Sequence, residues 1–89
     1  MNIEAVFFGQ LRELTGARER FAKLKEGARL VELFEYLGET FGPEFGDKIS
    51  TVEGLHIMVN GREHTMLGGN EATLRDGDTV VFLPPIFGG

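Results

Sequence analysis

Hydrophobic positions alternate with polar ones near both ends of this 89-residue chain, and they repeat with a helical period in its middle. Residues 3–8 are rich in β-branched and aromatic side chains and are followed by a glycine, a pattern typical of a strand. Residues 55–59 and 79–83 predict two further strands, and weaker alternation predicts strands at 19–24 and 62–65. The chain therefore alternates short strands with one clearly helical region.

The helix is predicted at residues 30–41. Its apolar positions recur every three or four residues and so share one face: Leu30, Leu33, Phe34, Leu37 and Phe41. A glycine and a proline at positions 42 and 43 end it. Residues 45–51 are expected to form a loop with at most one helical turn.

The order of strands and helix predicts an α+β domain, with a mixed sheet packed on one main helix. This arrangement is the ubiquitin-like β-grasp fold. The first and last strands are apolar runs, which suits a parallel pair at the buried centre of a sheet. We expect one domain over residues 1–83, followed by a flexible tail at 84–89.

Composition narrows the possible partners. Nine Lys and Arg against fourteen Asp and Glu give a net charge of −5, which argues against nucleic-acid binding because phosphate contacts need a basic surface. No apolar run reaches the roughly 18 residues of a membrane span, so a cytoplasmic protein without membrane contacts is expected. Cysteine is absent, which excludes disulfides and thiol ligands.

Metal binding is not expected either. His56 and His64 could face each other across a hairpin, but no third ligand is indicated. The stretch Asp76-Gly77-Asp78 lacks the rest of a calcium loop and predicts a turn.

The last seven residues, LPPIFGG, carry no charged side chain. Pro84 and Pro85 cannot donate to a sheet, so the chain should leave the sheet there and extend for up to about 20 Å. Because Gly88 and Gly89 lack side chains, the terminal carboxylate could enter a channel too narrow for a Cβ. The alternative is an ordinary glycine-rich end without a function.

A terminal carboxylate has a pKa of about 3.5, so it is ionised and is a poor electrophile. Another enzyme would have to activate it, most simply by transferring AMP from ATP. Attack by sulfur on the acyl adenylate would then give a thiocarboxylate, and attack by an amine would give an amide. The chain contains neither GxxxxGK[ST] nor GxGxxG, so we expect a carrier with no bound cofactor rather than a catalyst.

A second candidate feature is a set of apolar side chains whose strand parity is opposite to that of the expected core. These are Val6, Phe8, Met58, Val81 and Leu83. If the first and last strands are neighbours, they form one exposed patch beside the tail, and such a patch usually marks a partner site. The alternative is that the segment at residues 41–51 covers it.

Three stretches of the sequence resemble the MoaD family, the small sulfur-carrying subunits of molybdopterin synthase and relatives of ThiS and ubiquitin. They are VFFGQLRELTG at residues 6–16, VNG at 59–61 and LRDGDTVVFLPPIFGG at 74–89. The resemblance implies a β-grasp fold and a MoeB/ThiF-like adenylating partner that uses ATP. It also implies a thiocarboxylate on the last residue, insertion of the tail into a MoaE-like large subunit, and sulfur transfer to a pterin precursor.

By the same resemblance, Gly88 and Gly89 are the reactive residues. The expected docking surface is Val6, Phe8, Arg12, Met58, Val81, Leu83, Pro84, Pro85 and Phe87. Two positions depart from the family pattern: Phe87 stands where a small residue is more common, and Gly9 stands where alanine is usual.

Phe87 keeps other destinations open. The carrier could serve tRNA thiolation, thiamin synthesis or cysteine synthesis, or it could be attached to lysines as a ubiquitin-like modifier. A non-reactive β-grasp binding module that uses only the apolar patch is the third possibility.

Overall fold

The computed structural model describes residues 1–85. The strands are β1 (Asn2–Phe7), β2 (Glu19–Lys23), β3 (His56–Val59), β4 (Arg62–Glu63) and β5 (Thr79–Leu83). The α-helices are α1 (Gly9–Thr15), α2 (Leu30–Phe41) and α3 (Pro43–Thr51), and two 3₁₀ turns are η1 (His64–Leu67) and η2 (Gly69–Glu71).

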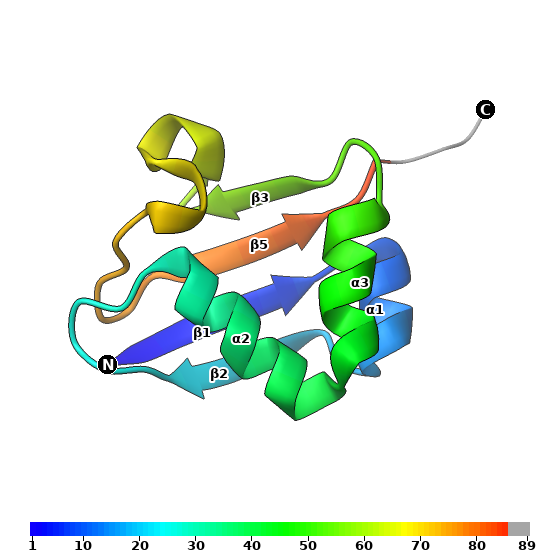
Figure 1. Cartoon of the computed structure of the whole chain (residues 1–89), viewed down its shortest axis with the longest axis horizontal. Coiled ribbons are helices and arrows are strands. Elements are labelled where there is room, and N and C mark those ends of the chain that lie inside the picture. The colour runs from blue at the N-terminus through cyan, green and yellow to red at the C-terminus, as the bar shows by residue number, and fades with distance from the viewer. Residues whose placement is uncertain (86–89) are drawn as a thin grey trace.

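The strands form one sheet in the order β2-β1-β5-β3-β4. The central strands β1 and β5 are parallel, and the other neighbours are antiparallel (Figure 1). Ala5 pairs with Val80 and Phe7 with Phe82, and all four side chains are buried. The predicted parallel pair at the centre of the sheet is therefore confirmed.

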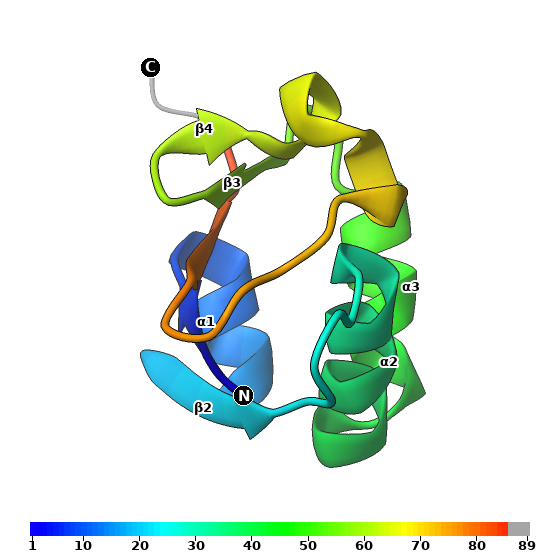
Figure 2. The same ribbon diagram turned by 90° about the vertical axis from the view of Figure 1, so that its left-hand side faces the viewer.

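Helices α2 and α3 lie on one side of the sheet, and α1 lies at the end of the sheet where β1 finishes (Figure 2). Helix α2 has the predicted bounds, and it buries Leu30, Leu33 and Leu37 against the sheet. Its start lacks a Ser, Thr, Asp or Asn cap, but the Glu32 carboxylate accepts a hydrogen bond of 2.8 Å from the backbone N–H of Arg29. A side chain inside the helix thus supplies the missing cap.

Residues 45–51 do not form the expected loop, because Pro43–Thr51 is a helix of nine residues. Proline is favoured in the first turn of a helix, where its missing N–H would be unpaired anyway. Phe45 is fully buried, with its ring centroid 5.8 Å from that of Phe7 and 5.6 Å from that of Phe82. Tertiary packing of one aromatic side chain outweighs the weak helix propensity of the glycine, serine and threonine around it.

The remaining differences are small. Strand β4 ends at Glu63, and the segment from His64 continues as a 3₁₀ turn rather than as a strand. None of the helices within residues 1–85 is long and apolar enough to cross a membrane. A mixed sheet with the parallel pair in its centre and a main helix packed across it is the β-grasp fold, as predicted.

Candidate functional site

The sheet face opposite the helices carries a row of apolar side chains. Val6 of β1 and Met58 of β3 are both register partners of Val81 of β5, so the three lie side by side across the central strands. Each is half-buried, whereas the residues that alternate with them are buried in the core. The alternative in which residues 41–51 cover this face is wrong, because α3 packs on the helix side of the sheet (Figure 2).

The row continues toward the C-terminal end of β5. Leu83, also half-buried, is the register partner of His56. The backbone N–H of Phe8 donates a hydrogen bond of 3.2 Å to the carbonyl of Phe82, so the chain after β1 stays beside the end of β5. Phe8 itself is 38% exposed. The predicted patch residues Val6, Phe8, Met58, Val81 and Leu83 are thus gathered on two adjoining parts of one surface.

A hollow of about 300 Å³ opens beside this row, lined by Val6, Phe8, Arg12, Arg18 and Glu19. The guanidinium carbon of Arg12 lies 5.7 Å from the centroid of the Phe8 ring. The Nε of Arg12 is buried and has no hydrogen-bond partner among residues 1–85. Arg12, which the family resemblance placed on the docking surface, therefore lies next to the apolar row.

The root of the tail belongs to the folded body. Strand β5 ends at Leu83, but Pro84 is buried and Pro85 is half-buried. Both prolines of the expected tail thus lie against the folded part. Phe87, Gly88 and Gly89 lie outside the described residues, and so does the expected flexibility of residues 86–89.

The sequence patterns missed Phe21, which is 62% exposed on the edge strand β2. It pairs with Glu4 of β1 and therefore shares the outer face with Val6. Its alternation with the buried Ala22 was the available signal. The outer face consequently extends over four strands instead of three.

Glu4 on β1 and Glu19 on β2 lie on the same face as Phe21 and Val6, and they are the register partners of these two residues. A side-chain hydrogen bond with Glu4, and the negative charge of Glu4, raise the pKa of Glu19 above its ordinary value. Thr79 donates its hydroxyl to Glu4 at 3.2 Å. This part of the face is therefore acidic, whereas the neighbouring hollow combines Glu19 with the two cations Arg12 and Arg18.

The histidines have separate structural partners. His56 Nδ1 contacts the Glu63 carboxylate, and His64 Nδ1 lies 3.1 Å from the carbonyl oxygen of Ile57. No cluster of three or more His, Asp or Glu side chains within residues 1–85 could hold a metal ion. Both histidines thus belong to the surroundings of the β3–β4 hairpin.

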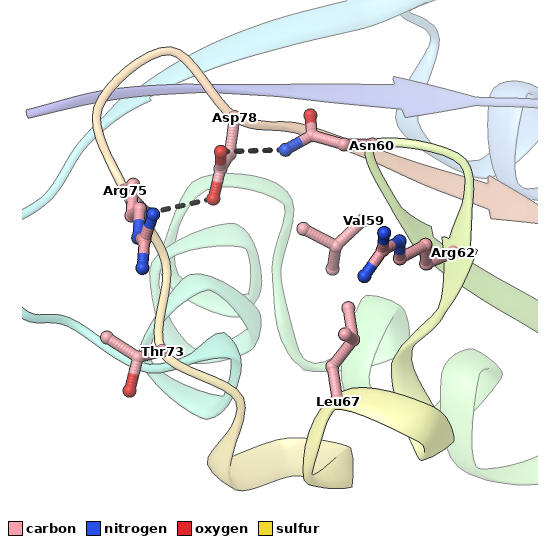
Figure 3. Close-up of a pocket in the computed structure, with 7 residues that line it drawn as sticks. All are labelled: Val59, Asn60, Arg62, Leu67, Thr73, Arg75 and Asp78. Carbon is pink, nitrogen blue, oxygen red and sulfur yellow. Dashed lines mark hydrogen bonds between the residues drawn. The ribbon is translucent and has the colours of Figure 1, made fainter.

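A larger hollow of about 650 Å³ lies at the other end of β5, away from the tail (Figures 1 and 3). Asp78 accepts hydrogen bonds there from the backbone N–H of Arg75 and from the side-chain amide of Asn60, both at 2.8 Å. Gly77 has φ +87°, and the Asp76 carboxylate accepts the N–H of Asn2 at 2.6 Å. These contacts confirm that the Asp-Gly-Asp stretch is a turn.

The fold, a five-stranded mixed sheet in the order β2-β1-β5-β3-β4 with an uncovered outer face, is that of a ubiquitin-like protein. A model described as "ThiS family" matches residues 5–89, so the chain belongs to the ThiS family. The resemblance to MoaD and ThiS proteins is thereby confirmed.

Three relatives match the whole chain or nearly all of it. Small archaeal modifier protein 3 of Haloferax volcanii is 29% identical over 92 residues and is covered completely, as is this chain. A chain of the BexX/CysO complex from Amycolatopsis orientalis is 28% identical with a TM-score of 0.77, covering 98% of this chain and 99% of that one. A chain of the complex of subunits 1 and 2 of molybdopterin-converting factor from Helicobacter pylori is 27% identical with a TM-score of 0.64, and both chains are fully covered.

Proposed function

We propose that this protein carries sulfur as a thiocarboxylate on Gly89 and is the MoaD-like small subunit of a molybdopterin synthase. The observation that carries the proposal is the uncharged segment PPIFGG, which follows directly on the central strand β5 and ends in Gly-Gly. Membership of the ThiS family supports the sulfur chemistry. Similarity to a chain of the Helicobacter pylori molybdopterin-converting factor supports the destination.

The chemistry starts at a terminal carboxylate that is ionised at neutral pH. In the proposed first step, an oxygen of the Gly89 carboxylate attacks the α-phosphorus of ATP on a MoeB/ThiF-like adenylating enzyme. The products are the acyl adenylate and pyrophosphate. Hydrosulfide then attacks the acyl carbon through its sulfur and displaces AMP, and loss of the remaining S–H proton gives the thiocarboxylate.

The outer sheet face is the proposed docking surface for both partners. Val6, Met58 and Val81 offer half-buried apolar area beside the strand that leads into the tail. A partner that covers this row would hold the tail root at a set distance from its own active site. In a MoaE-like large subunit, the thiocarboxylate sulfur would be transferred to a pterin precursor to build the dithiolene that binds the metal.

A second candidate function is attachment to other proteins. It is favoured by the full-length match to small archaeal modifier protein 3. The same acyl adenylate would then be attacked, directly or through a sulfur intermediate, by a lysine amine of the target to give an isopeptide bond. The two functions share the activation step and differ in the nucleophile.

The activation step is tested by incubating the protein with a MoeB/ThiF-like enzyme, ATP and a sulfide source, and then measuring the intact mass. We expect a gain equal to the exchange of one oxygen for sulfur, located on Gly89 by fragmentation. The control is the chain without Gly89, which should keep its circular dichroism spectrum and show no exchange. Absence of exchange in the full chain under conditions that activate another family member would overturn the proposal.

The destination is tested separately with the thiocarboxylated protein. We expect molybdopterin to form when a MoaE-like large subunit and the pterin precursor are added. If the protein instead forms isopeptide-linked conjugates and no molybdopterin is made, the result would favour the function as a protein modifier. Full cellular function after removal of Gly88 and Gly89 would instead identify a non-reactive binding module.

A further inference from the structure

Two glycines from distant parts of the chain lie against the two prolines at the root of the tail. Gly9 begins α1, and Gly54 lies in the loop between α3 and β3. The loop between α3 and β3 passes beside the end of β5, where the tail departs (Figure 1). A Cβ at Gly9 would lie 3.5 Å from Cγ of Pro84, and a Cβ at Gly54 would lie 3.3 Å from Cγ of Pro85.

These glycines are also in backbone conformations that side chains disfavour. Gly9 has φ +56° and Gly54 has φ +74°, both in the left-handed region. The two contacts are not equivalent, because 3.5 Å is an ordinary van der Waals distance, whereas at 3.3 Å the proline ring would have to shift. Gly54 is thus the position where an added side chain would displace Pro85.

The position of the proline rings limits the direction that the following residues can take. The ring holds the φ of a proline near −65°, so once Pro85 is placed, only its ψ remains to set the direction of the next residue. Four residues separate Pro85 from the terminal carboxylate, a reach of at most about 14 Å. Over so short a segment, a rotation of the root shifts the whole volume that the carboxylate can reach.

We propose that Gly54, together with Gly9, is a positioning residue. These glycines leave room for the rings of Pro85 and Pro84 to pack against the folded body, and this packing sets the direction in which the tail leaves it. This inference rests on the proposed function, because it concerns delivery of the Gly89 carboxylate to the adenylating partner. Misplacement of a reacting group by about 1 Å can cost two orders of magnitude in rate, so a small shift at the root is sufficient. The contact acts on the tail's direction and leaves the sheet face unchanged.

The chain offers a closely matched control for this idea. Gly27 has φ +78°, nearly the value of Gly54, and an added Cβ there would meet nothing within 4 Å. Gly54→Leu and Gly27→Leu therefore introduce the same side chain at nearly the same left-handed φ. Only the variant at position 54 presses on a proline.

The experiment measures thiocarboxylate formation on both variants as a function of carrier concentration. We expect both to lose similar thermal stability, and we expect Gly54→Leu to lower kcat by at least about tenfold with little change in KM. Gly27→Leu should keep the wild-type kcat, and Gly54→Ala should recover part of the loss. Equal kcat values for the two leucine variants, or a loss confined to KM, would overturn the inference.

A second readout does not need the partner enzyme. In the wild type, we expect nuclear Overhauser contacts between the Pro85 ring and the Hα protons of Gly54, and a shifted Ile86 amide resonance in Gly54→Leu but not in Gly27→Leu. If these contacts are absent, the packing of Pro85 against Gly54 is wrong. If they are present but the wild type is never thiocarboxylated, the proposed function is wrong, whereas the packing of Pro85 against Gly54 is confirmed.

Discussion

The rings of Phe7 in β1 and Phe82 in β5 lie stacked, with their centroids 5.5 Å apart and their planes inclined by 28°. The two residues are also register partners in the parallel pair of strands. One position earlier on each strand, Val6 and Val81 are partners on the opposite face. The same strand pair therefore builds the aromatic core on one side and the exposed apolar row on the other, so substitutions can affect them separately.

Replacement of Phe45 tests the importance of the helix that the sequence patterns missed. Phe45 is fully buried and contacts the rings of Phe7 and Phe82. We expect Phe45→Ala to lower the free energy of unfolding by about 3–5 kcal/mol, because it removes buried area and leaves a cavity. Urea denaturation followed by circular dichroism measures the change.

The matched control is Phe21→Ala, because Phe21 is 62% exposed. We expect that variant to stay within about 0.5 kcal/mol of the wild type, as is usual for surface substitutions. Similar losses at both positions would contradict the assignment of Phe45 to the core.

A charge in the apolar row should weaken partner binding without unfolding the domain. Val81 is half-buried between Val6 and Met58, so Val81→Lys would place an ammonium group in the middle of the proposed docking surface. We expect Kd for the large subunit to rise at least tenfold, which corresponds to about 1.4 kcal/mol. Calorimetric titration measures it.

Thr79→Lys is the control on the same strand and the same face, two residues farther from the tail. Thr79 pairs with Glu4, whose carboxylate can accommodate a lysine. An equal loss of affinity in both variants would show that the row is not the centre of the interface.

The neighbouring carboxylates on β1 and β2 predict a pH-dependent effect. Because Glu4 raises the pKa of Glu19, the folded protein holds that proton more tightly than the unfolded chain does. Stability is therefore lost as pH rises from the ordinary glutamate value through the raised one. We expect Glu19→Gln to raise Tm at pH 7 and to have no such benefit below both values.

Glu32 should affect the pH dependence of stability in the opposite direction to Glu19. The hydrogen bond from the Arg29 backbone, followed by the contact with Lys25, lowers the pKa of Glu32. Its contribution is present above the ordinary value and is lost as pH falls through the lowered one. Glu32→Gln should therefore lower Tm at pH 7, and melting curves from pH 3 to 8 distinguish the two carboxylates. The same sign for both variants at pH 7 would contradict this prediction.

Local patterns were sufficient for most of the elements. The repeat of leucines and phenylalanines predicted α2 with its observed bounds, because one apolar face of a helix is visible in the sequence alone. Helix α3 was missed because its apolar face consists of only Phe45 and Ile49, four residues apart, and so short a repeat does not distinguish a helix from a loop. The cap of α2 was missed because Glu32 reaches back from within the helix instead of preceding it.

The sequence by itself determined the class of fold, the parity of the outward side chains and the Gly-Gly end, since each depends on neighbouring residues or on the order of elements. Only the tertiary structure decided which residues meet. Val6 and Met58 lie on either side of Val81 because β5 enters the sheet between β1 and β3. Pro84 and Pro85 likewise lie against Gly9 and Gly54, which are far apart in the sequence and come together at the end of β5. Such contacts are set by strand order and packing, and no local period records them.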